Sequence, residues 1–380
     1  MSVPDKKAII NKTVIALQEL ITTNRIVYAL VLTILSSVFV EMFIRVGALE
    51  YTDSQPFQWS MCRWDCGWYA SIVNEGYSLE PNGHPKGDAA NWAFFPTFPL
   101  FAKFISLLAE ISAPLSLIIA SKLFLFFSLW TFIALAEEEL GGESKLIAGF
   151  VLAFNPYIVY AHAGYTETLY FFLTTLAFLL MRKRKYVLVG MAGALLSGTR
   201  FVGICFLFSY IINMVKVFRI SPAMQWSSLL LGLMIIPLGL AIFMVYLRFH
   251  VGDALAFKHV QVAWGGSIGN PITIVLNGLS AGGWQRYYAS IALGALGISA
   301  WLTLIRKYDY AVFLLIAILV PLSVRLQSMP RYVFWQMPFL FGILELMLRN
   351  RALFPLYLVF AGGVGGFVIL SWATGKLFVT

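Results

Sequence analysis

The sequence predicts an all-α membrane protein that crosses the bilayer many times, and composition is the first reason. Hydrophobic residues make up 60% of the 380 residues and charged residues only 12%, and the mean hydropathy is +0.81. A soluble domain must cover its surface with polar groups and carries about twice that charged fraction. Aromatic residues reach 16%, which is typical of lipid-facing surfaces and of the belts at membrane interfaces.

The second reason is the number of long apolar runs. A helix needs about 20 apolar residues to span the hydrocarbon, and fewer where neighbouring helices shield it. We count about eleven such runs and assign them to one domain that covers residues 1–380. They lie near residues 25–46, 115–136, 145–160, 165–181, 186–199, 201–215, 226–248, 286–305, 310–323, 331–348 and 353–373.

The third reason is the distribution of positive charge. With the N-terminus in the cytoplasm, the loops predicted on the inner side hold 15 of the 27 Lys and Arg residues, and each loop carries at least one. This is the positive-inside pattern of membrane proteins. In a soluble protein a net charge of +9 would raise the question of nucleic acid. Here it reflects topology, and we expect no nucleic-acid partner.

The N-terminal segment predicts a retained membrane anchor. Residues 1–25 are polar and mixed in charge, and no small-residue cleavage site follows the first apolar run. A cleaved signal peptide would show such a site.

Two long segments are predicted on the outer side, at 49–114 and 249–285. The first contains the apolar run 98–110, which has only about 13 residues and therefore predicts a helix that lies at the interface without crossing. If it crossed, the basic cluster 182–185 would fall outside. A long loop in a compact membrane protein is usually functional.

The same charge count predicts a hairpin of two short helices. The basic cluster 182–185 and the pair Lys216 and Arg219 are only about 30 residues apart, so both can be inside only if the chain turns between them. The turn at 197–200 then places Arg200 at the outer end of the hairpin. An arginine in an apolar region is costly unless it is paired or binds an anion.

The three cysteines cannot form a disulfide framework. Cys62 and Cys66 are four residues apart and could pair only in a suitable turn. With no histidine nearby, a zinc site is not expected. We interpret all three cysteines as structural.

Asp65 is the strongest candidate for chemistry because it stands among aromatic residues just after the first span. The segment also contains Arg63, Trp64, Trp68 and Tyr69. Aromatic walls exclude water and stack on sugar faces, and a carboxylate can accept a proton from an attacking hydroxyl. The alternative is that Asp65 caps the helix that begins near it.

Three cations near the outer boundary suggest an anionic ligand such as a lipid phosphate. Lys122, Arg200 and Arg331 lie in or beside apolar runs, and snorkelling to the interface is the alternative for outer cations. Glu167 begins a membrane helix after a break at Asn155 and Pro156. It could cap that helix or orient a catalytic arginine.

The outer segment 252–265 offers a polar lining. It contains Asp253, His259, Gln261 and Trp264. A metal site at His259 is not expected because outer carboxylates are sparse around it and only His250 is near in the sequence.

Taken in order, several motifs between residues 63 and 338 resemble those of the PIG-V family of mannosyltransferases, the family of the glycosylphosphatidylinositol mannosyltransferase II. They are Arg63-Trp64-Asp65 with Trp68-Tyr69, Ala93-Phe94-Phe95-Pro96, Tyr165-Thr166-Glu167, the turn with Arg200, Gly252-Asp253 with Gln261 and Trp264-Gly265, and Pro330-Arg331-Tyr332. The short loops of this chain are typical of a prokaryotic member.

The resemblance implies the GT-C glycosyltransferase fold, with a large first extracytoplasmic loop and interfacial helices. It also implies transfer of a sugar, with mannose as the expected one, from a polyprenyl-phosphate donor of the dolichol-phosphate type to a lipid or glycolipid acceptor. Asp65 matches the family's first-loop acid, the expected general base of an inverting displacement. No cofactor or metal is implied. The active site would be extracytoplasmic, in the bacterial inner membrane for a prokaryotic member and in the endoplasmic reticulum for a eukaryotic one.

We therefore expect Arg200, Arg331 and Lys122 to bind the donor phosphate. The rest of the predicted site comprises Arg63, Trp64, Trp68, Tyr69, Phe95, Tyr165, Glu167, Asp253, His259, Gln261, Trp264 and Tyr332.

Two alternatives stay open at this point. One is a GT-C transferase that acts on lipid A, a protein or a cell-wall glycan. The other is a transporter or lipid flippase, which would favour internal repeats and paired broken helices near the midplane. The polar residues of this chain instead gather on one predicted face, and no repeat of 20–50 residues is evident. The sequence names no protein partner.

Overall fold

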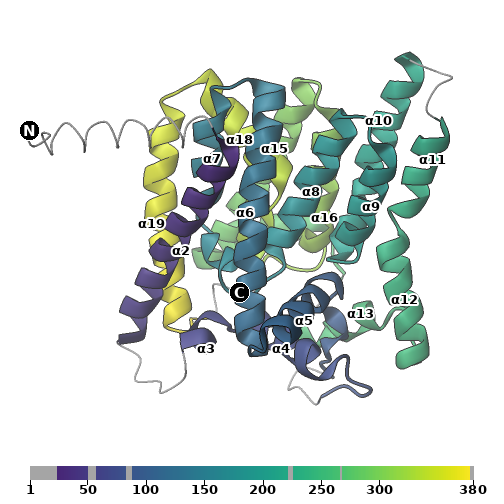
Figure 1. Ribbon diagram of the computed structural model, residues 1–380. Coiled ribbons are helices and arrows are strands. Elements are labelled where there is room, and N and C mark those ends of the chain that lie inside the picture. The colour runs from purple at the N-terminus through teal and green to yellow at the C-terminus, as the bar shows by residue number, and fades with distance from the viewer. Residues whose placement is uncertain (1–23, 50–56, 83–87, 221–225, 266–267, 377–380) are drawn as a thin grey trace, which may run out of the picture.

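The computed structural model describes residues 24–49, 57–82, 88–220, 226–265 and 268–376. In these ranges the chain forms a helical bundle, and an isolated β-bridge joins Asn82 and Ala89. Short helices gather at one end of the bundle, which we call the outer end (Figure 1). The polytopic all-α fold predicted from the sequence is confirmed.

Among the described residues, six helical segments are long and apolar enough to cross a membrane. They are α2 (Arg25–Leu49), α6 (Ala113–Leu140), Phe201–Phe218 with α10 (Phe206–Ile220), Trp226–His250 with α11 (Trp226–Ile235) and α12 (Leu238–His250), α15 (Gly283–Leu304) and α19 (Leu353–Ala373).

The other five predicted spans are shorter helices. They are α7 (Ser144–Ala153), α8 (Glu167–Arg182), α9 (Tyr186–Ser197), α16 (Tyr308–Leu322) and α18 (Met337–Arg349), the last preceded by α17 (Met329–Phe334). All eleven predicted runs thus contain helix, but five fall short of the about 20 residues that a full crossing requires.

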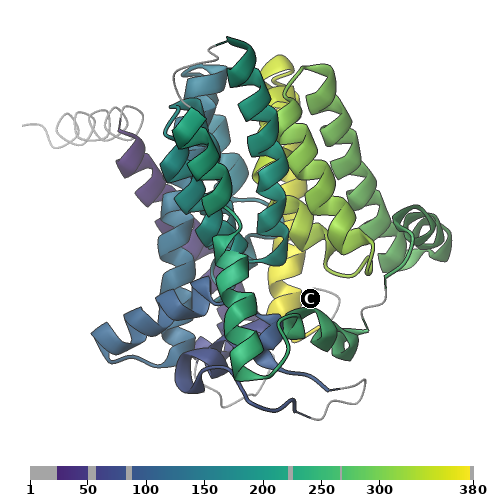
Figure 2. The same ribbon diagram turned by 90° about the vertical axis from the view of Figure 1, so that its right-hand side faces the viewer.

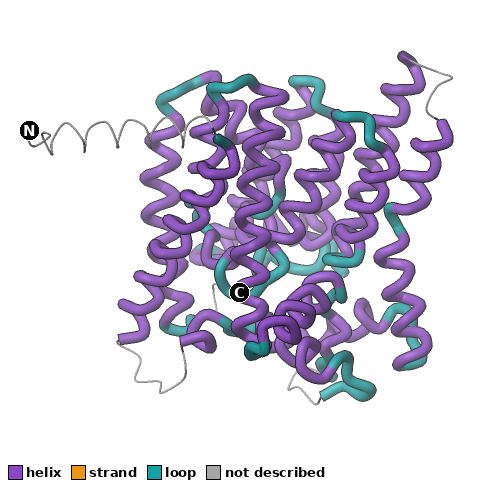
Figure 3. The backbone as a smooth tube through the Cα atoms, in the orientation of Figure 1, coloured by secondary structure: helices purple, strands orange, loops and turns teal. Residues whose placement is uncertain are grey.

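The short helices end inside the bundle, where their connecting turns are buried. Figure 3 shows such loop segments, in teal, at the depth of the lower half of the bundle. Irregular backbone at membrane depth is tolerated only where it is buried in protein or lines a cavity, because its polar groups need partners. The turn after α7 has them: the Asn155 side chain accepts from the Tyr157 amide at 2.9 Å and donates to the Leu152 carbonyl at 3.1 Å.

The helices at the outer end are short and include α3 (Phe57–Met61), α4 (Asp65–Glu75), α5 (Thr97–Ala109) and α13 (Ala256–His259). Helix α14 (Pro271–Ala281), in the predicted outer segment 249–285, was not expected as a helix. These helices divide the two predicted outer loops into structured pieces.

Helix α5 is the interfacial helix that the sequence predicts. It lies across the end of the bundle rather than along its axis (Figures 1 and 2). Phe98 and Ala102 are buried, whereas Phe104, Leu107 and Leu108 are between 62% and 75% exposed. A helix with one buried side and one bare apolar side suits the boundary between lipid and water.

A disulfide joins Cys62 and Cys66 between α3 and the first turn of α4. Cys205 is free and buried. The Cys62–Cys66 pairing that the sequence left open therefore forms, and the disulfide closes a short loop that contains Asp65.

The opposite end of the bundle is held by buried ion pairs. Arg182 contacts Glu139 and Asp309 at 2.7 Å each, and Lys307 contacts Glu139 at 2.6 Å. These contacts join α6, α8 and the start of α16. Arg182 and Lys307, two of the predicted inner cations, are thus structural partners of acids at this end.

Candidate active site

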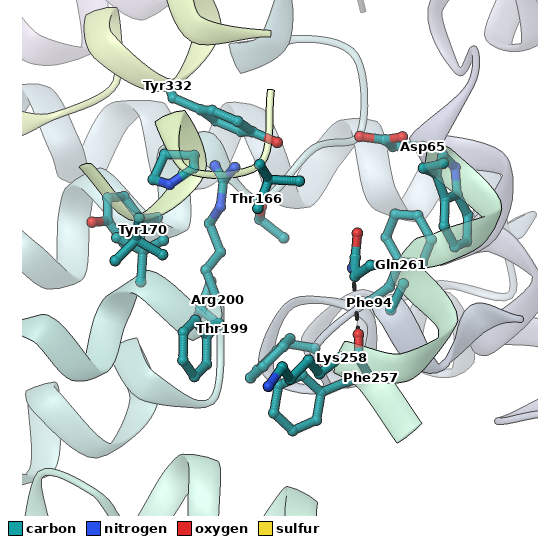
Figure 4. A pocket seen from close by; sticks show the side chains of 18 of the residues that line it. Asp65, Phe94, Thr166, Tyr170, Thr199, Arg200, Phe257, Lys258, Gln261 and Tyr332 are labelled. Atoms are coloured by element: carbon teal, nitrogen blue, oxygen red, sulfur yellow. Dashed lines mark hydrogen bonds between the residues drawn. The ribbon is translucent and has the colours of Figure 1, made fainter. Parts of the chain in front are cut away.

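A cavity of about 930 Å³ opens at the outer end of the bundle (Figure 4). Its walls come from α4, the turn before α8, the turn after α9, α13 and the segment from α16 to α17. The residues that line it include Asp65, Tyr69, Phe94, Phe95, Tyr165, Thr166, Glu167, Tyr170, Thr199, Arg200, Phe201, Val202, Phe257, Lys258, His259, Gln261, Trp264, Ile268, Val320, Val324, Arg325, Arg331, Tyr332 and Gln336.

Two arginines and two carboxylates meet at the wall of this cavity. The NH1 group of Arg331 contacts Asp65 Oδ2 at 2.8 Å, and Nε of Arg331 contacts Glu167 Oε1 at 3.1 Å. Arg200 NH1 donates to the same Glu167 oxygen at 3.0 Å. The side chains of Arg331 and Glu167 are 8% and 1% exposed. Four residues that are far apart in the sequence therefore form one ion network.

Tyrosine rings surround both guanidinium groups. The carbon Cζ of Arg331 lies 5.1 to 5.4 Å from the ring centroids of Tyr160, Tyr165 and Tyr332. Arg200 lies 5.0 Å from Tyr332. Such cation–π contacts gain strength where water is excluded. They hold the arginines in place without neutralising them.

Asp65 is fixed by the backbone around it. It is the first residue of α4, after Trp64 with a φ of 48°. The hydroxyl of Tyr165 accepts from the Asp65 amide at 3.2 Å and donates to the Arg63 carbonyl at 2.9 Å. Trp64, not Asp65, is the N-cap, and it makes no side-chain cap hydrogen bond. The Asp65 carboxylate pairs with Arg331, which disfavours the capping alternative.

Arg200 stands at the turn between α9 and α10, as the hairpin prediction places it. Its backbone is extended, between the end of α9 at Ser197 and a short 3₁₀ turn at Phe201–Cys205. A Cβ added at Gly203 would come within 2.2 Å of the Leu196 carbonyl oxygen. Only glycine allows this turn to close so tightly.

Most of the other predicted residues also reach the cavity. Besides Asp65, Glu167, Arg200 and Arg331, the structure brings there Tyr69, Phe95, Tyr165, His259, Gln261, Trp264 and Tyr332. Trp68 stands behind the wall, stacked on Phe94 with ring centroids 5.9 Å apart.

Asp253 supports the cavity wall from outside. Its carboxylate accepts from the Leu255 amide at 2.9 Å and lies 2.6 Å from His259 Nδ1. The hydrogen bond with His259 lowers the pKa of Asp253 below its ordinary value. Asp253 therefore orients His259, and only the latter lines the cavity.

Besides Trp68 and Asp253, three predicted residues do not line the cavity. Lys122 pairs with Glu41 on α2, and this acid supplies the compensation that a cation in an apolar run requires. Arg63 donates to the Ala373 carbonyl at 3.0 Å. Trp64 packs edge-on against Trp372 at 4.7 Å. The expected phosphate contact of Lys122 is corrected accordingly.

The predicted site left out several residues that line the cavity. Arg325 lines the cavity, and its NH1 group donates to the Trp264 carbonyl at 2.8 Å. Gln336 accepts from the Tyr170 hydroxyl at 3.1 Å. Lys258, Thr166 and Thr199 also line it. The sequence signal that points to Arg325 and Lys258 as site residues is their place in outer segments, which normally carry few cations.

Positive charge dominates around Tyr332. The carbon Cζ of Arg331 lies 5.1 Å and that of Arg200 5.0 Å from the ring centroid of Tyr332. In the described part of the chain, no three His, Cys, Asp or Glu side chains gather as a metal-ligand group.

Comparison with known proteins was made by sequence and by structure. No family model matches the chain, and no curated protein matches its sequence. The resemblance to the PIG-V family therefore stays a prediction from its motifs.

Solved structures do match. ArnT from Cupriavidus metallidurans, bound to undecaprenyl phosphate, aligns with a TM-score of 0.51 and 13% identity, over 90% of this chain and 72% of that one. The fold is GT-C. The archaeal oligosaccharyltransferase AglB from Archaeoglobus fulgidus, in complex with an inhibitory peptide and a dolichol-phosphate, aligns with a TM-score of 0.45 and 12% identity, over 93% of this chain and 56% of that one.

The ion network predicts how the protein responds to loss of Glu167. Glu167→Ala leaves Arg200 without an ion pair among the described residues and leaves Arg331 with Asp65 alone. Breaking a buried pair by removing one partner costs roughly 3–5 kcal/mol. We expect a clear drop in the thermal unfolding temperature of the purified protein in detergent. Asp253→Ala removes an acid of a more exposed pair and should change it little. Equal effects of the two variants would contradict the network.

Proposed function

We propose that this protein is an integral membrane glycosyltransferase that transfers a sugar from a polyprenyl-phosphate donor to a lipid or glycolipid acceptor. The observation that carries the proposal is the contact of Asp65 with Arg331 at the wall of a cavity whose lining has more cationic than acidic side chains. The likeness in fold to ArnT, whose structure holds undecaprenyl phosphate, supports it.

Asp65 is the general base in this proposal. Its carboxylate takes the proton of the acceptor hydroxyl while the hydroxyl oxygen attacks the anomeric carbon of the sugar. The bond between that carbon and the phosphate oxygen breaks, and the lipid phosphate leaves with the bonding electrons. A single displacement inverts the configuration, so a β-linked donor gives an α-linked product.

Arg331 couples the proton transfer to the departure of the phosphate. Before the reaction it pairs with the ionised Asp65. When Asp65 takes the proton its negative charge disappears, and the phosphate gains one negative charge in the same step. The positive charge of Arg331 is then available to stabilise the leaving group, which is the electrostatic stabilisation that most lowers such barriers.

Glu167 and Arg200 hold this arrangement together. Glu167 contacts both arginines and is 1% exposed, so it positions them rather than meeting the substrate. Arg200 lines the cavity and uses NH1 for Glu167. The N–H groups of Arg200 that do not contact Glu167 can donate hydrogen bonds to the phosphate.

The choice of sugar and of cofactor rests on further observations. The motif resemblance to the PIG-V family supports mannose as the sugar.

Four cationic side chains line the cavity: Arg200, Lys258, Arg325 and Arg331. They can supply the charge stabilisation that a metal gives in many transferases, and we propose a reaction without a metal cofactor.

We place the cavity on the extracytoplasmic side of the membrane. The predicted inner loops hold 15 of the 27 Lys and Arg residues, and those loops that the structure describes lie at the end of the bundle opposite the cavity. The Cys62–Cys66 disulfide is at the cavity end, and disulfides persist mainly in oxidising compartments. For a prokaryotic chain this membrane would be the bacterial inner membrane.

The direct test of the proposed function is Asp65→Asn. The variant keeps the shape of the side chain but cannot accept the proton, so transfer should fall by about 10²–10⁴-fold. The assay measures sugar transfer from a synthetic mannosyl polyprenyl phosphate to extracted membrane lipids in detergent. Binding of the donor should be retained.

Glu75→Gln is the matched control, since Glu75 is an exposed acid on the same helix, at its far end. Near-normal transfer by Asp65→Asn would overturn the role of Asp65. No transfer by the unmodified protein from any polyprenyl-phosphate sugar would overturn the proposed function. Because no compartment has to be crossed in detergent, a transporter would also give none.

The orientation can be checked in intact cells. Glu80→Cys introduces an exposed thiol beside the cavity end, and Lys183→Cys introduces one at the opposite end. A membrane-impermeant maleimide should label the first and not the second. The reverse pattern would place the cavity in the cytoplasm.

A further inference from the structure

The charges that line the cavity fall into two groups with different partners. In the inner group, Arg200 and Arg331 contact Asp65 and Glu167 at 2.8 to 3.1 Å. Two positive charges there meet two negative ones. An additional anion would gain little net attraction from this group while both carboxylates are ionised.

The second group, Arg325 and Lys258, we call the rim cations. Both line the same cavity. Arg325 donates from NH1 to the Trp264 carbonyl, which is a neutral acceptor, and makes no ion pair among the described residues. Lys258 likewise has no acidic partner within the described ranges. The acid nearest to it in the sequence, Asp253, contacts His259 instead.

The rim cations come from two separate segments that line the same cavity. Lys258 is on α13, and Arg325 lies between α16 and α17. The Arg325–Trp264 hydrogen bond ties the second segment to the loop that follows α13. In Figure 4, Lys258 and Gln261 lie on the side of the cavity opposite Tyr332.

The balance of charge in the cavity is positive. Four cationic side chains and two carboxylates line it in the described part of the chain, an excess of two positive charges. The cavity lining therefore carries positive charge that no carboxylate of the ion network neutralises.

From this distribution we propose that Arg325 and Lys258 form the main seat for the phosphate of the lipid, whereas Arg331 and Glu167 position the inner network. The inference rests on the proposed function. It replaces the expectation that Arg200 and Arg331, together with Lys122, are the main phosphate ligands.

The charge excess selects the kind of phosphate. A sugar linked through one phosphate carries a single negative charge as a diester, and the departing monoester carries about −1.5 to −2 at neutral pH. Two unpaired cations match the monoester. The seat therefore favours the lipid monophosphate that the reaction releases, and this product should inhibit the reaction as it accumulates.

Apolar residues beside the rim identify the phosphate as that of a lipid. Val262 is 61% exposed, Ile268 79% and Phe201 43%. All three line the cavity. An exposed apolar border next to the two rim cations suits a molecule with a charged head and a hydrocarbon tail. Free inorganic phosphate could contact the cations, but it has no hydrocarbon tail to pack against this apolar border.

The experiment measures binding of undecaprenyl phosphate to the purified full-length protein by thermal shift in detergent. Arg325→Gln and Lys258→Gln should each weaken binding roughly tenfold, because each removes a charge-assisted contact. The double variant should lose more. Binding of undecaprenol, which lacks the phosphate, should not change between the unmodified protein and the variants.

Lys103→Gln and Arg286→Gln are the matched controls, since both remove cations from the same end of the bundle that do not line the cavity. Their affinities should equal that of the unmodified protein. If the double variant unfolds at the same temperature as the unmodified protein without ligand and still binds undecaprenyl phosphate with unchanged affinity, the rim seat is wrong.

Two further outcomes separate this inference from the proposed function. Inorganic phosphate that stabilises the protein as strongly as undecaprenyl phosphate would overturn the lipid assignment. If the unmodified protein transfers sugar but the rim variants keep full affinity, only the seat fails. If the unmodified protein neither binds undecaprenyl phosphate nor transfers sugar, both the rim seat and the proposed function fail.

Discussion

The double ion pair of Arg331 is the constraint on which the rest of the structure depends. One guanidinium contacts Asp65 from the first outer segment and Glu167 from the start of α8. A buried charge costs several kcal/mol unless it is well paired. The first outer segment, α8 and α17 must therefore meet at one point, and the tyrosines around Arg331 exclude water from it.

The short helices make that meeting possible. Full-length spans would carry the ends of α8 and α9 past the bilayer and leave Glu167 and Arg200 in water. Because these helices are only 16 and 12 residues long, their ends remain inside the bundle, and their turns line the cavity. The outer helices and the Cys62–Cys66 disulfide then set Asp65 against Arg331. With this geometry, the cavity is a protected place at the membrane boundary in which the proposed reaction could occur.

Much of this could be predicted from the sequence, because hydropathy and loop charge report on the membrane directly. They located the apolar runs, the interfacial helix α5 and the hairpin that carries Arg200. They could not show which acid a given cation meets. Lys122 pairs with Glu41, 81 residues away, and Arg325 reaches a carbonyl 61 residues away. Such contacts depend on packing between helices, which periodicity in one helix does not encode.

The most direct measurement is an electron cryo-microscopy structure of the protein with a non-cleavable polyprenyl-phosphate sugar bound. The account predicts that the anomeric carbon lies beside the Asp65 carboxylate in the cavity and that Arg331 still contacts both Asp65 and Glu167. A sugar bound outside this cavity, or an Arg331 that leaves Asp65 to bind the phosphate of the intact donor, would contradict it.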